Sequence, residues 1–101
     1  MMRKNCRLTY DAWRDGRALE ATPSIWTDGA TVYSYQTAIA VRRPSGVLLN
    51  RTPYSRTTTT HQNALAVQLY SDAVAYLEVW DVPRDTQHLF HRLSTKENQT
   101  L

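Results

Sequence analysis

The spacing of apolar residues changes once along this chain, near Pro53, and this change constrains the fold more than any other feature. From residue 31 to residue 41, bulky and small side chains alternate, which is typical of a strand with one face on a core. The bulky set is Tyr33, Tyr35, Thr37, Ile39 and Val41. From Asn63 onward, apolar residues recur at steps of three or four, which is typical of a helix. A sheet is therefore expected first and an α-helix after it.

Short strands are expected on both sides of residues 31–41. Asp28-Gly29 favours a hairpin turn, because glycine readily takes a positive φ, so residues 25–27 are expected to pair with the strand that follows. Residues 42–46 form the next predicted turn, and residues 47–51 form the returning strand. Together these segments predict a three-stranded antiparallel meander.

The main helix is expected to begin near Thr59 or Thr60, because a hydroxyl at that place can accept from the free amides of the first turn. It runs to about Trp80, or it breaks at Ser71-Asp72, which can cap a second helix. Pro83 limits its end.

Two weaker helices flank this arrangement. Residues 8–20 favour a short helix, with a strand and turn across Asp15-Gly16 as the alternative. Residues 85–93 favour one or two further helical turns. The expected fold is α+β: a three-stranded antiparallel meander packed against one long helix, with short flanking helices.

Length and composition predict one domain spanning residues 1–101, with flexible ends at 1–7 and 94–101. The 101 residues make a thin core, so the expected state is a monomer or a homodimer that covers the rest of the sheet. No stretch approaches the ~20 apolar residues of a bilayer span, and the N-terminus does not read as a signal peptide. A cytoplasmic protein is expected.

The charged residues and the single cysteine limit the kinds of ligand that the chain is expected to bind. The net charge is +3, and ten of the twelve basic residues are arginine, whose planar fork suits phosphate and carboxylate groups. A GC-rich genome that favours arginine codons is the alternative explanation. Cys6 is the single cysteine and has no intramolecular partner, and no Cys and His set has zinc-site spacing. Neither a metal nor a cofactor is expected.

The segment from residue 54 to residue 63 is the most specific polar feature. Four consecutive threonines suit a helix start, where hydroxyls lie beside free N–H groups and the partial positive charge attracts anions. The predicted partner-binding residues are Tyr54, Ser55, Arg56, Thr57, Thr58, Thr59, His61 and Gln62, together with Arg42, Arg43 and Arg51. The alternative is a helix cap whose hydroxyls satisfy only their own backbone.

Other candidate sites have a simpler structural explanation. His61 with Ser55 or Tyr54 could form a base and nucleophile, but this needs side chains within hydrogen-bond reach. His88 and His91 have the i, i+3 spacing of a metal pair, but no carboxylate or thiolate ligand lies nearby in the sequence, so a solvated helix face is favoured. The aromatic residues of the first two strands, with the nearby arginines, could stack bases, although core packing is favoured. These are Trp26, Tyr33 and Tyr35.

Residues 26–29, 33–40 and 54–63 resemble a family of small uncharacterised proteins encoded by bacteriophages and other mobile elements. The shared pattern is a strand with Y-S-Y-x-T-x-I, a return strand and Y-S-x-T-T-x-x-H-Q, and the resemblance covers roughly residues 25–68. Glycine often follows Y-S-Y in that family, whereas this chain has Gln36, so a backbone kink at this point is in doubt. The resemblance implies a phage or prophage accessory protein in a bacterial cytoplasm.

A non-catalytic binding role follows as the first hypothesis, because a chain of this size has little room for both a core and a preorganised catalytic site. The expected target is a host nucleic-acid-handling complex, with a CRISPR-type defence complex as the concrete example. The alternative is direct binding of DNA or RNA through the threonine-rich helix start and the arginines. An enzyme that uses His61 is the third hypothesis.

Overall fold

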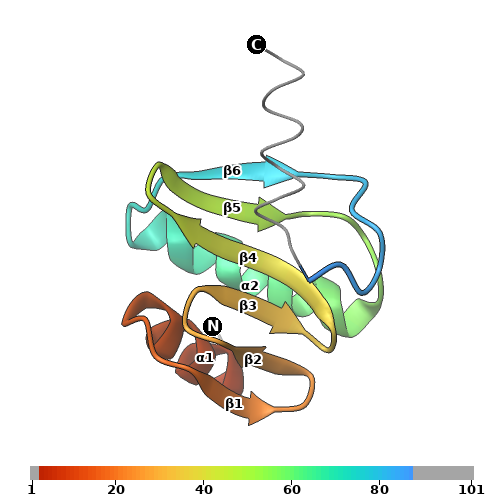
Figure 1. Ribbon diagram of the computed structural model, residues 1–101, viewed down its shortest axis with the longest axis horizontal. Coiled ribbons are helices and arrows are strands. Elements are labelled where there is room, and N and C mark those ends of the chain that lie inside the picture. Colours follow the sequence, from red (N-terminus) through yellow and green to blue (C-terminus); the bar gives the residue numbers. More distant parts are fainter. Residues whose placement is uncertain (1–2, 88–101) are drawn as a thin grey trace.

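The computed structural model describes residues 3–87, which form a six-stranded sheet with two helices packed on one face (Figure 1). The elements are α1 (Lys4–Arg14), β1 (Leu19–Thr22), β2 (Ile25–Thr27), β3 (Thr31–Ser34), β4 (Thr37–Arg43), β5 (Gly46–Asn50), α2 (Arg56–Ser71) and β6 (Tyr76–Val79). The strands lie in chain order, and neighbours are antiparallel up to β5. β5 and β6 are parallel, and α2 provides the crossover that such a pair requires.

The predicted three-stranded meander with one long helix is wrong, because residues 31–41 form two strands and not one. The chain reverses at Tyr35-Gln36, where Tyr35 has a φ of 56°, a value that tight hairpins often require. The register also shifts between Val32 and Tyr33. The bulky residues of this segment therefore do not share a face: Tyr33 lies on the helix-free face and Ile39 on the helix face.

The predicted helix boundaries also need correction. α1 begins at Lys4, so residues 4–7, which were expected to be flexible, are helical and Cys6 is buried. The helix ends at Arg14 and not near residue 20, because Gly16 takes a φ of 75° two residues later and lets the chain turn into β1.

α2 ends at Ser71 and does not run to Trp80. Ala73, with a φ of 56°, turns the chain back into strand β6, where the main helix or a second helix was expected. Residues 85–87, the start of the second predicted flanking helix, are not helical. The rest of that segment and the predicted flexible tail, residues 94–101, lie outside the described residues.

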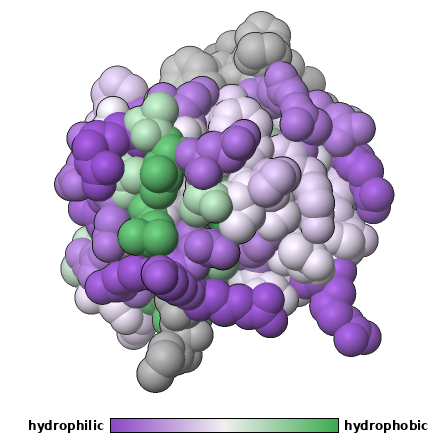
Figure 2. All heavy atoms as spheres, turned by 90° about the horizontal axis from the view of Figure 1, so that it is seen from below, coloured by the Kyte–Doolittle hydropathy of each residue, from purple (hydrophilic) through white to green (hydrophobic). Residues whose placement is uncertain are grey.

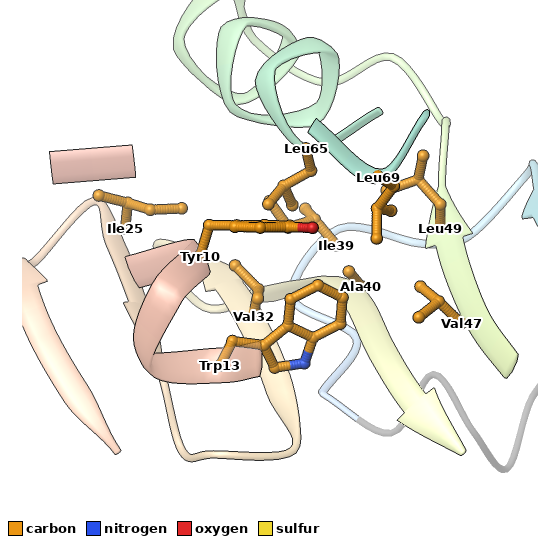
Figure 3. Close-up of a cluster of buried hydrophobic side chains, with 10 residues drawn as sticks. All are labelled: Tyr10, Trp13, Ile25, Val32, Ile39, Ala40, Val47, Leu49, Leu65 and Leu69. Atoms are coloured by element: carbon orange, nitrogen blue, oxygen red, sulfur yellow. The ribbon is translucent and has the colours of Figure 1, made fainter. Parts of the chain in front are cut away.

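The main core lies between the sheet and the two helices (Figure 3). Tyr10 and Trp13 of α1 meet edge to face, with ring centroids 5.8 Å apart, and Leu65 and Leu69 of α2 lie against the same sheet face. All four side chains are at most 2% exposed. Burying side chains of this size stabilises the fold by about 1.5–3 kcal/mol each.

The helix-free face of the sheet carries a second, smaller cluster of buried residues. Trp26 stacks on Tyr33 there, with ring centroids 4.1 Å apart. After β6 the chain packs Val82 against this cluster, and it then bonds to β4 through Asp85 N–H to Thr37 Oγ1 and Ala38 N–H to the carbonyl of Thr86. No helix within residues 3–87 is long and apolar enough to cross a membrane.

Candidate functional site

The start of α2 holds most of the residues that the sequence singles out, and several of them turn inward. Ser55 is the N-cap: its Oγ accepts from the N–H of Thr58 at 3.2 Å. Such a cap satisfies one of the free first-turn amides. The Thr58 side chain is buried and meets Ser34 of β3, with 2.9 Å between the two hydroxyl oxygens. Capping, the simpler explanation of this segment, therefore accounts for Ser55, whereas the Thr58 hydroxyl bonds to other side chains.

His61 completes a hydrogen-bonded series that runs from Ser55 through Thr58 and Ser34 to the imidazole, called here the hydroxyl chain. Ser55 Oγ donates to Thr58 Oγ1 at 3.2 Å, and Ser34 Oγ lies 2.8 Å from His61 Nδ1. If each hydroxyl donates onward, Ser34 donates to an unprotonated Nδ1, which requires the neutral imidazole. Burial lowers the pKa of His61, and the charge of Arg3 lowers it further. Both influences favour that neutral form.

A second set of bonds ties the start of α2 to β5. Gln62 Nε2 donates to the carbonyls of Asn50 at 2.7 Å and Thr52 at 2.9 Å. Asn50 Nδ2 donates to the Tyr54 hydroxyl at 3.0 Å, and Tyr54 in turn donates to the carbonyl of Val82. Tyr54 and Gln62 therefore hold together the loop after β5, the helix and the segment after β6.

The three predicted arginines do not join the helix start in one recognition surface. Arg42 donates to the carbonyl of Trp13 and, at 2.9 Å, to that of Gly29, so it fastens the end of α1 to the β2–β3 turn. Arg51 donates to Asn63 of α2 at 3.0 Å and lies 3.7 Å from a carboxylate oxygen of Glu78. Arg43 is half-buried at the end of β4.

The predicted site residues at the helix start that remain exposed are Ser55, Arg56, Thr57 and Thr59. His61 does not contact Ser55 or Tyr54 directly, so the predicted base and nucleophile do not meet. Its hydroxyl partner is Ser34, and these two residues are 5% and 1% exposed. The pair can share a proton, but it offers no room for a substrate.

No group of three or more His, Cys, Asp or Glu residues within residues 3–87 is placed to hold a metal ion. His88 and His91 lie outside the described residues.

The outer side of strand β6 is the candidate site that sequence reasoning missed. We call it the β6 edge: the outward main-chain groups of Tyr76–Val79 with the side chains of Leu77, Glu78 and Trp80. The carbonyls of Ala75 and Val79 accept from β5, at 3.2 and 2.8 Å. Since main-chain groups alternate along a strand, those of Tyr76 and Glu78 point away from β5. Within the described part of the chain, β6 has no second neighbouring strand.

The side chains along the β6 edge are unusually apolar for an exposed strand. Leu77 is 55% exposed and Trp80 is 49% exposed. Tyr70, near the end of α2, is 81% exposed, and it lies two helical turns from Asn63 on the flank that faces β5 through Arg51. A strand edge with such neighbours is a template for pairing with another chain.

The opposite edge of the sheet, β1, is protected in the way that natural sheets protect their edges. Its register shifts between Glu20 and Thr22, its middle carries the exposed Glu20, and Pro23 follows it. Seen from the side of β1, hydrophilic side chains surround a small hydrophobic patch (Figure 2). Bulges, charges and proline discourage pairing at an edge. β6 runs beside β5 through four successive pairs without a shift and contains no proline.

Comparison with known proteins adds a family match. Residues 10–81 match a family whose description reads "Family of unknown function (DUF8033)". The matched range runs from within α1 to the second residue after β6, so it includes all six strands. Among curated proteins and among solved structures, nothing matches the chain.

Proposed function

Because the chain belongs to the DUF8033 family of unknown function, we propose a function from its surface: it binds a protein partner, and an extended segment of that partner adds a strand to the β6 edge. Strand addition of this kind takes its affinity from main-chain hydrogen bonds and its specificity from alternate side chains. The role is non-catalytic.

The observation that carries this proposal is the difference between the two edges of one sheet. β1 combines a register shift with a following proline, whereas β6 is regular and borders exposed Leu77 and Trp80; each edge also carries one exposed glutamate, Glu20 on β1 and Glu78 on β6. An unprotected strand edge promotes aggregation. Because this sheet protects β1 but leaves β6 regular, we take the β6 edge to be a binding surface.

The kind of partner, and the cell in which it occurs, are inferred from the resemblance to phage-encoded proteins. On that basis the partner is a nucleic-acid-handling complex of a bacterial host, such as a CRISPR-type defence complex, and binding inhibits it in the cytoplasm. The added strand would compete for a surface that the complex uses in its own assembly or substrate binding.

Direct binding of DNA or RNA is the weaker candidate. Arg42 and Arg51 are already occupied by carbonyl, amide and carboxylate oxygens of the protein itself. A gel-shift titration at two salt concentrations separates the two ideas, because phosphate-driven binding weakens steeply with salt. The proposal expects no binding to generic DNA or RNA at either concentration.

The test of the proposed function is co-elution with purified defence complexes in size-exclusion chromatography, with a matched pair of variants at Glu78. Glu78→Thr keeps the outward N–H, and Glu78→Pro removes it, while both remove the carboxylate. We expect a complex that survives Glu78→Thr, although weakened, and is lost with Glu78→Pro. A complex that tolerates Glu78→Pro as well as Glu78→Thr contradicts strand addition at this edge.

A further inference from the structure

The β6 edge also indicates what kind of segment it accepts. We infer that the partner's strand carries a lysine or arginine directly opposite Glu78, between two apolar or aromatic residues. This inference rests on the proposed function, since it needs an added strand, and it names the chemistry of that strand.

Glu78 lies between two aromatic side chains on the helix side of the sheet. Tyr76 packs against the core cluster on that side, and the alternation along a strand places Glu78 and Trp80 on the same side. In an added antiparallel strand, the residue opposite Glu78 has its Cβ within about 5.5 Å of the Glu78 Cβ. Its side chain therefore lies against the carboxylate, with Tyr76 and Trp80 within reach as diagonal neighbours.

The charge at this position is only partly balanced within the protein. Arg51 approaches Glu78 from β5 through a single contact, 3.7 Å from Nε to Oε2, and the Glu78 side chain remains 42% exposed. A basic residue on the added strand would place Glu78 between two cations, with Arg51 on its β5 side and the partner's residue on its other side. Opposite charges directly across a ladder are favourable. The rings of Tyr76 and Trp80 offer the same cation a favourable face.

The same geometry argues against a second copy of this chain as the occupant. A two-fold pairing of two β6 strands through Tyr76 and Glu78 alone centres on Leu77, and the longer pairing that also uses the main chain of Trp80 centres on Glu78. The longer pairing, which has more main-chain hydrogen bonds, places one Glu78 directly opposite the other. Like charges in that position are unfavourable. The arrangement thus favours a partner strand of opposite charge over self-association.

The test is a selection from a display library of random twelve-residue peptides on the full-length protein. Peptides are kept if they bind this protein and fail to bind Glu78→Pro. We expect the kept peptides to share a lysine or arginine two positions away from apolar residues on both sides. For a representative synthetic peptide, replacing that residue by glutamine should weaken binding by about fivefold.

Variants at Glu78 then separate the possible results. Glu78→Gln should reduce the preference for a basic residue to less than twofold, and selection on Glu78→Lys should enrich acidic residues instead. Kept peptides without a basic residue overturn this inference but leave strand addition intact. A selection that yields no peptide sensitive to Glu78→Pro contradicts the proposed function itself. A protein that sediments as a dimer and becomes monomeric with Glu78→Pro overturns the choice of occupant.

Discussion

Ser34 Oγ lies 2.8 Å from His61 Nδ1, and this contact joins the last residue of β3 to the second turn of α2. The two residues are 27 positions apart in the sequence, and both are buried. The contact explains why a polar strand end and a polar helix start occur in one chain: each satisfies the other away from water. It also explains why most of the conspicuous helix-start residues serve the fold.

Replacing Ser34 by alanine should lower the free energy of unfolding by about 1–3 kcal/mol, because Nδ1 of His61 and the Thr58 hydroxyl each lose a buried partner. Urea unfolding measures the change. Ser45→Ala, at the exposed turn between β4 and β5, is the control and should stay within about 0.5 kcal/mol of the parent. Equal effects of the two substitutions would show that the hydroxyl chain contributes nothing.

Stability should fall as the pH is lowered from 7 to 5. Burial lowers the pKa of His61 in the folded protein below the ordinary value of 6.5, so the unfolded chain takes up a proton first. The stabilisation is fully present above pH 6.5 and is lost as the pH falls toward the folded pKa. His61→Asn removes the imidazole, so the slope of stability against pH over this range should become shallower than in the parent. An unchanged slope contradicts a neutral, buried His61.

Arg42→Ala should cost roughly 1.5–3 kcal/mol, because the carbonyls of Trp13 and Gly29 lose a charged donor. Arg56→Ala is the matched control. Arg56 opens α2, where a positive charge opposes the helix dipole, so its removal should be neutral or slightly stabilising. Thermal unfolding of both variants measures the difference. If Arg42→Ala is as harmless as Arg56→Ala, Arg42 does not fasten α1 to the sheet.

Two tyrosines, Tyr10 and Tyr33, should titrate later than an ordinary phenol, because burial raises the pKa of each. Burial, together with the hydrogen bond to Asp72, raises the pKa of Tyr10 to about 12. Above pH 10 the unfolded chain loses this proton while the folded protein keeps it, so stability falls as the pH rises. The ultraviolet absorbance of tyrosinate follows the titration. The component near pH 12 should disappear in Tyr10→Phe, and its persistence in that variant would assign it to another residue.

Sequence reasoning found the elements whose pattern is local. The Asp28-Gly29 turn, the strand at 47–51 and the change to helix after Pro53 each depend on neighbouring residues, and β2, β5 and α2 lie at or near the expected places. It failed where the structure depends on contacts between residues that are distant in the sequence. Tyr35 turns the chain with a positive φ that is uncommon for an aromatic residue, so no turn signal marks the β3–β4 reversal.

Sequence reasoning missed the β6 edge for a similar reason. Residues 76–79 continue the apolar spacing of α2 and are too short to show a clear period of two, so they read as helix. Tyr76, Val79 and Trp80 are residue types that favour strands, and this was the one local signal for β6. The partners of the predicted site could not be found from sequence, because Ser34 and Asn50 meet α2 only after the crossover has folded.

Amide hydrogen exchange of the full-length protein, followed residue by residue by NMR, tests the open β6 edge most directly. The account predicts that the N–H groups of Leu77 and Val79, directed toward β5, exchange slowly, and that those of Tyr76 and Glu78 exchange at least tenfold faster. Equally slow exchange at all four positions would mean that the edge is already paired, and strand addition at β6 would then be wrong.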